Sequence, residues 1–266
     1  ALAVQSGVVT ILGSGDEFDP KDIEGGETGE TVASGLLTST VGSGNAGTIE
    51  LSAERLEMES GLIGSASTGD GAAGSVGLRL AKGVTLGQGA RVSVSSSQAD
   101  GGDIEIESAG EVRMAKSELT ASAAKDGGSI RLLGVGDRSI RDSRISAEAG
   151  QDGGNITISK PGLLFMNRGQ LSANAVYGQG GYISVVADTF LPSLDSLITA
   201  SSECGAQGVV EIDSVEADIG GGLVALPDQL MDRAVNLAER RALQLQGNVS
   251  SFFVHGQVGL PVWSKE

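Results

Sequence analysis

The chain has 266 residues, of which 42 are glycine and only 3% are aromatic, and its formal net charge is −16. This acidic balance argues against nucleic acid and against an anionic membrane surface as partners, whereas it favours solubility and divalent cations. The 39% of hydrophobic residues argues against disorder, and no apolar run is long enough to predict a membrane span.

Cysteine and histidine are too scarce to support a zinc site or an internal disulfide. Cys204 is the only cysteine, and we interpret it as a small side chain that fills a corner of the fold. His255 is the only histidine and lies near the C-terminus. No signal peptide is recognisable and residues 1–4 are already strand-like, so we expect a fragment or processed product whose export signal lay upstream.

Residues 1–43 are less regular than the rest of the chain. Residues 8–12 are typical of a strand, and residues 14–30 then form an acidic segment in which Lys21 is the only cation. We expect irregular first coils in which this segment is a solvated loop. A cation site is the alternative, although the carboxylate spacing does not match an EF-hand loop.

Residues 44–216 carry a repeat whose copies contain two small residues, one free position and an aliphatic residue. A clear copy is Gly127-Gly128-Ser129-Ile130. The second small residue, which we call the marker, falls at positions 47, 74, 102, 128, 154, 181 and 208, so the period is 26–28 residues. A fixed period of this length in a glycine-rich chain is typical of a solenoid.

Three short strand-like runs divide each period. In the copy after Gly128, Ile130 and Leu132 share one face, a second apolar position follows at Ile140, and a third run starts at Ile145. This pattern predicts an all-β, right-handed parallel β-helix with three strands per coil, in which equivalent residues of successive coils stack. An antiparallel sandwich is the alternative, but it does not require such a constant period. The inward stack should include Ile130, Ile156 and Ile183.

Asp100, Asp126 and Asp152 each stand two residues before a marker glycine. They should therefore stack at one corner, about 4.8 Å apart. We favour turn chemistry, because Asp before Gly bonds its own backbone and tolerates a left-handed conformation. Stacked carboxylates also repel one another and can recruit a cation, so the alternative is a weak calcium site formed by these three residues. No other cofactor is expected.

The outward positions of the first strand do not suggest catalysis. Glu105 and Arg131 fall on adjacent coils and predict a cross-strand ion pair. The sequence supports no Ser-His-Asp arrangement, and no group of acids with a basic residue recurs over three coils as a lyase-like groove would require. We therefore expect a protein that is not an enzyme, with a carbohydrate-binding or carbohydrate-active β-helix protein as the alternative.

The repeat ends after residue 216, and residues 217–266 are predicted to cap the solenoid. Pro227 and Asp228 are typical of a first helical turn, apolar residues then recur at helical spacing, and Gly247 ends the pattern. We expect a helix at about 227–245 and a final strand at 249–254. A solenoid needs a cap on its last coil, and a helix that docks on a partner is the alternative.

Two groups of residues resemble the filamentous-haemagglutinin-type exoproteins of two-partner secretion. The repeat copy at 44–49 looks like their coils, and the segments 226–232 and 250–261 are similar to the ending common in cyanobacterial members. The resemblance covers about residues 30–261. The chain departs from the family in lacking a cysteine after the helix, in having Gly256-Gln257-Val258-Gly259 where Gly-Arg-Gly-Gly is frequent, and in lacking the N-terminal secretion domain.

The resemblance implies the C-terminal part of a larger secreted or surface-displayed structural and adhesive protein. It implies a location outside a Gram-negative bacterium or on its outer surface, reached through an outer-membrane two-partner transporter. Its partners would be other surface proteins, or glycans of host or neighbouring cells. A subunit of an extracellular assembly that docks through its ends is a further alternative.

Overall fold

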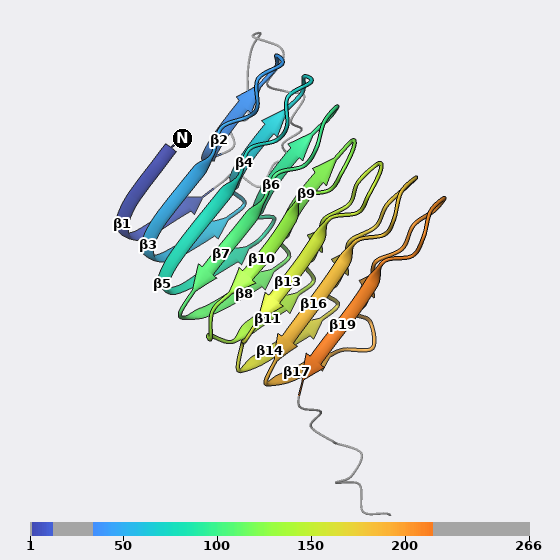
Figure 1. Ribbon diagram of the computed structural model, residues 1–266. Coiled ribbons are helices and arrows are strands. Elements are labelled where there is room, and N and C mark those ends of the chain that lie inside the picture. Colours follow the sequence, from blue (N-terminus) through green and yellow to red (C-terminus); the bar gives the residue numbers. More distant parts are fainter. Residues whose placement is uncertain (1, 13–33, 215–266) are drawn as a thin grey trace, which may run out of the picture. The chain divides into compact units, whose positions relative to one another are not determined.

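The computed structural model describes residues 2–12 and 34–214 (Figure 1). These residues lie within the compact unit Ala1–Ala217, and they contain strands but no helix. None of the described segments is therefore a helix that could cross a membrane. The predicted acidic loop at 14–30 and the predicted cap at 217–266 lie outside the described residues.

All described strands pair in parallel, in two sheets that follow each other around every turn (Figure 1). The larger sheet contains β1 (Leu2–Leu12), β3 (Ile49–Glu59), β5 (Val76–Gly87), β7 (Ile104–Ser108), β8 (Glu111–Ala115), β10 (Ser129–Leu133), β11 (Arg138–Arg141), β13 (Asn155–Ser159), β14 (Leu163–Asn167), β16 (Tyr182–Ala187), β17 (Thr189–Pro192) and β19 (Val209–Ser214). The smaller sheet contains β2 (Gly35–Thr40), β4 (Leu62–Ser67), β6 (Arg91–Ser96), β9 (Glu118–Ala123), β12 (Arg144–Ser146), β15 (Gln170–Ser172) and β18 (Leu197–Thr199).

The pairing register confirms the predicted solenoid. Ile130 pairs with Ile104 on one side and with Ile156 on the other, so each strand lies beside the strand one period away. The smaller sheet takes one strand from each turn and has seven strands, which gives a β-solenoid of about seven turns. Because the pairing is parallel throughout the described residues, the alternative of an antiparallel sandwich is wrong.

The interior is a column of stacked aliphatic side chains. Ile130, Ile156 and Ile183 are aligned by strand pairing and have no exposed surface, as predicted. The second and third runs of each period also point inward. Their buried residues include Leu86, Met114, Ile140 and Met166 in the larger sheet, and Leu119, Ile145 and Leu171 in the smaller sheet.

The marker positions are glycine because the backbone of the preceding turn lies against them. A Cβ atom built on Gly128 would overlap the carbonyl oxygen of Gly102, and one on Gly154 would overlap that of Gly128. Even the side chain of alanine would therefore push neighbouring turns apart. This close approach of two backbones accounts for the strict recurrence of small residues in the sequence.

One buried position departs from the aliphatic pattern. Arg138 pairs with Val112 and Leu164 in an inward-facing row, and only 1% of its surface is exposed. Its guanidinium group donates hydrogen bonds to the carbonyl oxygens of Leu133 at 2.9 Å and Gly134 at 3.2 Å. Burial lowers the pKa of this guanidinium. The backbone of a tight corner thus supplies acceptors for Nη1 and Nη2, whereas the buried Nε has no hydrogen-bond partner.

Two features lie where the sequence did not place them. Strand β1 pairs with β3, and β2 pairs with β4, so regular parallel pairing begins before residue 44. The interpretation of Cys204 as a corner filler is wrong, because this residue is exposed. It stands in the turn before the last marker, where the corner is open to solvent.

Candidate functional site

Five successive turns place a residue other than glycine in the left-handed backbone region at the same corner. Every one of these residues is polar, and each is followed by Gly or Ser before a strand of the smaller sheet begins. An L-residue in this conformation costs about 1–2 kcal/mol, which glycine would avoid. The residues are Ser60 (φ 52°), Gln88 (φ 51°), Lys116 (φ 52°), Asp142 (φ 48°) and Arg168 (φ 49°).

Beneath this corner, buried polar groups of neighbouring turns are joined by hydrogen bonds. The backbone N–H of Ser117 donates to Oγ of Ser143 at 3.1 Å, and that hydroxyl donates to the carbonyl oxygen of Arg141 at 2.7 Å. Both serine side chains are buried. The backbone N–H of Lys116 donates to the same carbonyl at 3.0 Å. Each turn is therefore fixed to the next, and the exposed side chains stand on a rigid base.

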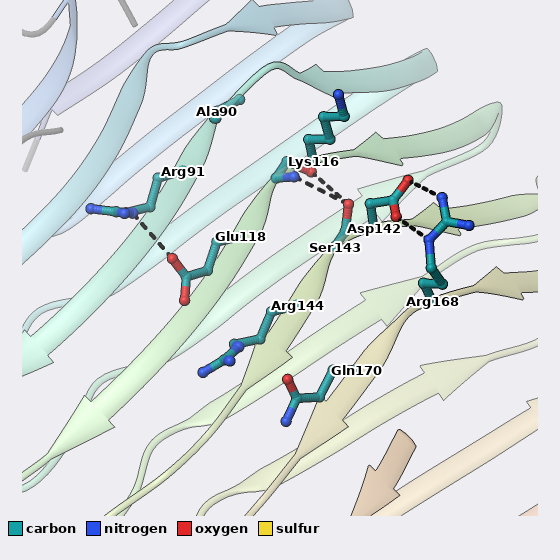
Figure 2. Close-up of a pocket in the computed structure, with 11 residues that line it drawn as sticks. Ala90, Arg91, Lys116, Glu118, Asp142, Ser143, Arg144, Arg168 and Gln170 are labelled. Carbon is teal, nitrogen blue, oxygen red and sulfur yellow. Dashed lines mark hydrogen bonds and ion pairs between the residues drawn. The ribbon is translucent and has the colours of Figure 1, made fainter. Parts of the chain in front are cut away.

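A shallow, open groove of about 510 Å³ runs along this corner. Figure 2 shows its polar side chains in two rows. The corner row consists of Lys116, Asp142 and Arg168, and the strand row consists of Arg91, Glu118, Arg144 and Gln170. The strand row is fixed by register, because these four residues are paired in succession across β6, β9, β12 and β15.

Two ion pairs use both carboxylates of the groove. Nε of Arg91 lies 3.2 Å from Oε2 of Glu118. Arg168 binds Asp142 through two parallel hydrogen bonds, Nε to Oδ1 at 2.5 Å and Nη2 to Oδ2 at 3.0 Å. These bonds, together with the nearby charge of Lys116, lower the pKa of Asp142. The carboxylate therefore stays ionised well into the acidic range.

The other two cations keep their donors available. Within the described part of the chain, the side chains of Lys116 and Arg144 make no hydrogen bond and no ion pair with another side chain. The groove thus has four cations and two carboxylates in a chain of net charge −16. Its described lining contains no aromatic residue. Such a surface suits a polar ligand with both negative charges and hydroxyl groups.

The predicted acid ladder does stack at one corner, and the side chains of Asp126 and Asp152 accept hydrogen bonds from the backbone. Oδ1 of Asp126 accepts from the backbone N–H of Asp152 at 3.4 Å, and Oδ1 of Asp152 accepts from that of Gln179 at 2.7 Å. Asp100 precedes them, and its neighbour Gly101 donates to the carbonyl oxygen of Asp126 at 2.8 Å. These bonds link successive turns, whereas the predicted bonds to each residue's own backbone and the left-handed conformation are not seen at these three positions.

The structure gives the calcium hypothesis no further support. Over residues 2–12 and 34–214, no group of three or more His, Cys, Asp or Glu side chains is arranged to hold a metal ion. Asp100, Asp126 and Asp152 are exposed at their corner. Calcium at this ladder is thus a hypothesis from the sequence alone.

The predicted cross-strand ion pair is present on the outer face of the larger sheet. Nε of Arg131 donates to Oε2 of Glu105 at 3.0 Å, between residues that are direct partners of β10 and β7. Arg79 lies 3.8 Å from both Glu50 and Glu107 on the same face. These arginines are matched with carboxylates, so this face is a network of surface ion pairs, whereas the groove retains unmatched cations.

Sequence reasoning missed the groove, although a signal for it exists. A polar residue, a Gly or Ser, a second polar residue and an aliphatic residue recur as 116–119, 142–145 and 168–171. No protein-family model, curated protein or solved structure gives a significant match to the chain. The fold and the groove therefore rest on the chain's own residues and their geometry.

Proposed function

We propose that the chain is a non-catalytic structural and adhesive β-solenoid of the bacterial surface. In this proposal it is the C-terminal part of a larger exoprotein exported through a two-partner transporter, and its coils are right-handed with three strands each. The observation that carries the proposal is the uninterrupted parallel pairing from β1 to β19, which repeats the same outward positions on every turn.

A solenoid of this kind suits work outside the cell. Each turn buries its aliphatic residues against its two neighbours, so stability does not depend on a disulfide or on one large core. Repetition also presents outward side chains at a spacing of about 4.8 Å, which lets many weak contacts act together. The acidic surface keeps such a protein soluble.

Surface display can be tested on intact cells of the source organism. Antibodies raised against the purified chain should label whole cells, and added protease should remove the label without cell lysis. Deletion of a two-partner outer-membrane transporter should abolish the label, whereas a periplasmic marker should be unaffected in both strains. A chain that stays protected until the cells are lysed would contradict the proposal.

The groove favours carbohydrate binding as the second candidate function. Its mixture of carboxylates, guanidinium groups and one amide resembles the donors and acceptors that hydroxyl groups require. Incubation of the chain with acidic and neutral polysaccharides, followed by measurement of new reducing ends, separates binding from catalysis. We expect no new ends, and a steady rate of release would favour the carbohydrate-active alternative.

A further inference from the structure

We propose that the groove formed by the corner row and the strand row binds an extended, 1,4-linked polyuronate that crosses successive turns. The inference rests on the proposed adhesive function, because it names the ligand class for which that surface is suited. Three observations carry it: the placement of the cations, the alternation of donors and acceptors, and the retention of long side chains at a strained corner.

The cations are placed once per turn and alternate between the two rows. Arg91 and Arg144 belong to the strand row and are two turns apart, and Lys116 and Arg168 belong to the corner row with the same separation. Turns are about 4.8 Å apart, so the four charges span about 14 Å. An extended 1,4-linked uronate chain advances per sugar by about the spacing between two turns. Its successive carboxylates point to opposite sides of the chain.

Arg144 is the central anchor of this arrangement. Strand pairing places it between Glu118 and Gln170, and Figure 2 shows its side chain extending along the groove beside them. A guanidinium group can bind a carboxylate through two parallel hydrogen bonds. Within the described residues no carboxylate takes up these donors. Lys116 offers a second charge on the opposite row, one turn away.

The remaining side chains suit the hydroxyl groups of a sugar. Glu118 and Asp142 are acceptors, and Gln170 has both a donor and an acceptor. The same two carboxylates disfavour nucleic acid and polyphosphate, whose closely spaced charges would lie against them. Because the described lining contains no aromatic ring for stacking, each site should bind weakly, and avidity would come from many displayed copies.

Glycine could form the backbone of this corner without any charged side chain. Gly avoids the cost of the left-handed conformation, yet Lys116, Asp142 and Arg168 occupy it on three consecutive turns. Their side chains project into solvent and contribute little to the core. The strain is thus consistent with a surface that holds charged groups in fixed positions.

The test is calorimetric titration of the full chain with a tetramer of 1,4-linked galacturonate. The double variant Lys116→Gln/Arg144→Gln should bind roughly tenfold more weakly or worse, because two charge-assisted hydrogen-bonding groups are lost. Arg113→Gln, a change at an exposed arginine outside the groove, should bind like the wild type. Both variants should melt like the wild type, and binding should weaken as salt increases.

The ligand controls separate the chemistry of the glycan from simple charge. The methyl ester of the same tetramer lacks the carboxylates and should not bind measurably. Tighter binding of single-stranded DNA or polyphosphate than of the tetramer would overturn the proposal, as would unchanged affinity in the double variant. A surface-displayed chain that binds no galacturonate tetramer would refute this inference alone, whereas a binding chain confined within cells would refute the proposed surface function.

Discussion

Arg131 and Glu105 lie directly opposite each other on adjacent strands, with Nε of the arginine 3.0 Å from Oε2 of the glutamate. They are 26 residues apart in the sequence, which is one period of the repeat. The contact is an ion pair, and it also shows that equivalent residues of adjacent turns lie side by side. Both side chains are partly exposed, so the pair itself contributes no more than about 1 kcal/mol, and the register must be held by the interior.

The interior stack should be intolerant of charge. Ile156→Asp places a carboxylate between Ile130 and Ile183 with no water and no partner, and should cost about 4 kcal/mol or more. Thr157→Asp, on the next residue but the outward face, should change stability by less than about 0.5 kcal/mol. Thermal denaturation followed by circular dichroism compares the two, and similar melting temperatures would show that the assigned register is wrong.

Arg138 should stabilise the fold in spite of its buried charge. Arg138→Leu fills the space with an apolar group but leaves the carbonyl oxygens of Leu133 and Gly134 without donors, a loss of about 3 kcal/mol. Ser139→Ala on the same strand is the matched control, expected within about 0.5 kcal/mol of the wild type. Denaturant titration measures both. A more stable Arg138→Leu protein would mean that burial of the cation is a net cost.

Tyr182 should titrate above the ordinary range of tyrosine. Its hydroxyl donates a hydrogen bond to Oε2 of Glu211 on the adjacent turn, and this bond is the main reason that its pKa is raised above 10.0. Because the pKa of Tyr182 is higher in the folded protein than in the unfolded chain, the hydrogen bond stabilises the fold fully at pH values below the pKa of the unfolded chain. This stabilisation is lost as the pH rises through the pKa of the folded protein. Absorbance titration of the phenolate measures the shift, with Tyr182→Phe used to assign it.

Substitution of the acceptor tests the cause of that shift. Glu211→Ala removes both the hydrogen bond and the negative charge, so the pKa of Tyr182 should fall towards its ordinary value. Glu211→Gln keeps an acceptor oxygen and should give an intermediate result. An unchanged titration curve in Glu211→Ala would show that the two residues do not interact in solution.

The acid ladder should behave as a set of hydrogen bonds between successive turns. Asp126→Asn retains an oxygen that can accept from the backbone N–H of Asp152, so its stability should match the wild type, whereas Asp126→Ala should lose about 1 kcal/mol. Calcium should leave the melting temperature of all three proteins unchanged. A concentration-dependent rise that is absent in Asp126→Asn would instead establish the calcium site at Asp100, Asp126 and Asp152.

The repeating part of the fold could be predicted because its physical causes leave a periodic trace in the sequence. Glycine recurs at the position of Gly128 because a neighbouring backbone excludes any side chain there. An aliphatic residue recurs at the position of Ile156 because each turn buries that position. Period and alternation together then determine parallel pairing. The ion pair of Glu105 with Arg131 followed from the same register.

Features that depend on one residue at one turn left no such trace. Arg138 stands at an inward position of its strand, but a charged residue is not expected in the interior. The sequence does not reveal that a tight corner provides carbonyl acceptors for this buried cation. The groove was missed for a different reason. Lys116 and Asp142 look like ordinary loop residues until the left-handed corner brings equivalent positions of neighbouring turns together. Neither effect can be deduced from composition or period alone.

The most direct test of the stacked, in-register turns is a pair of distances between spin labels on the outer face. Equivalent positions on different turns are occupied by Glu50, Thr157 and Glu211. Thr157 lies four turns from Glu50, and Glu211 lies six turns from Glu50. With cysteines at these sites in a Cys204→Ser background, pulsed electron paramagnetic resonance should give separations of about 19 Å for positions 50 and 157, and about 29 Å for positions 50 and 211. A distance that does not grow with the number of turns, or a shorter one for the second pair, would contradict the solenoid.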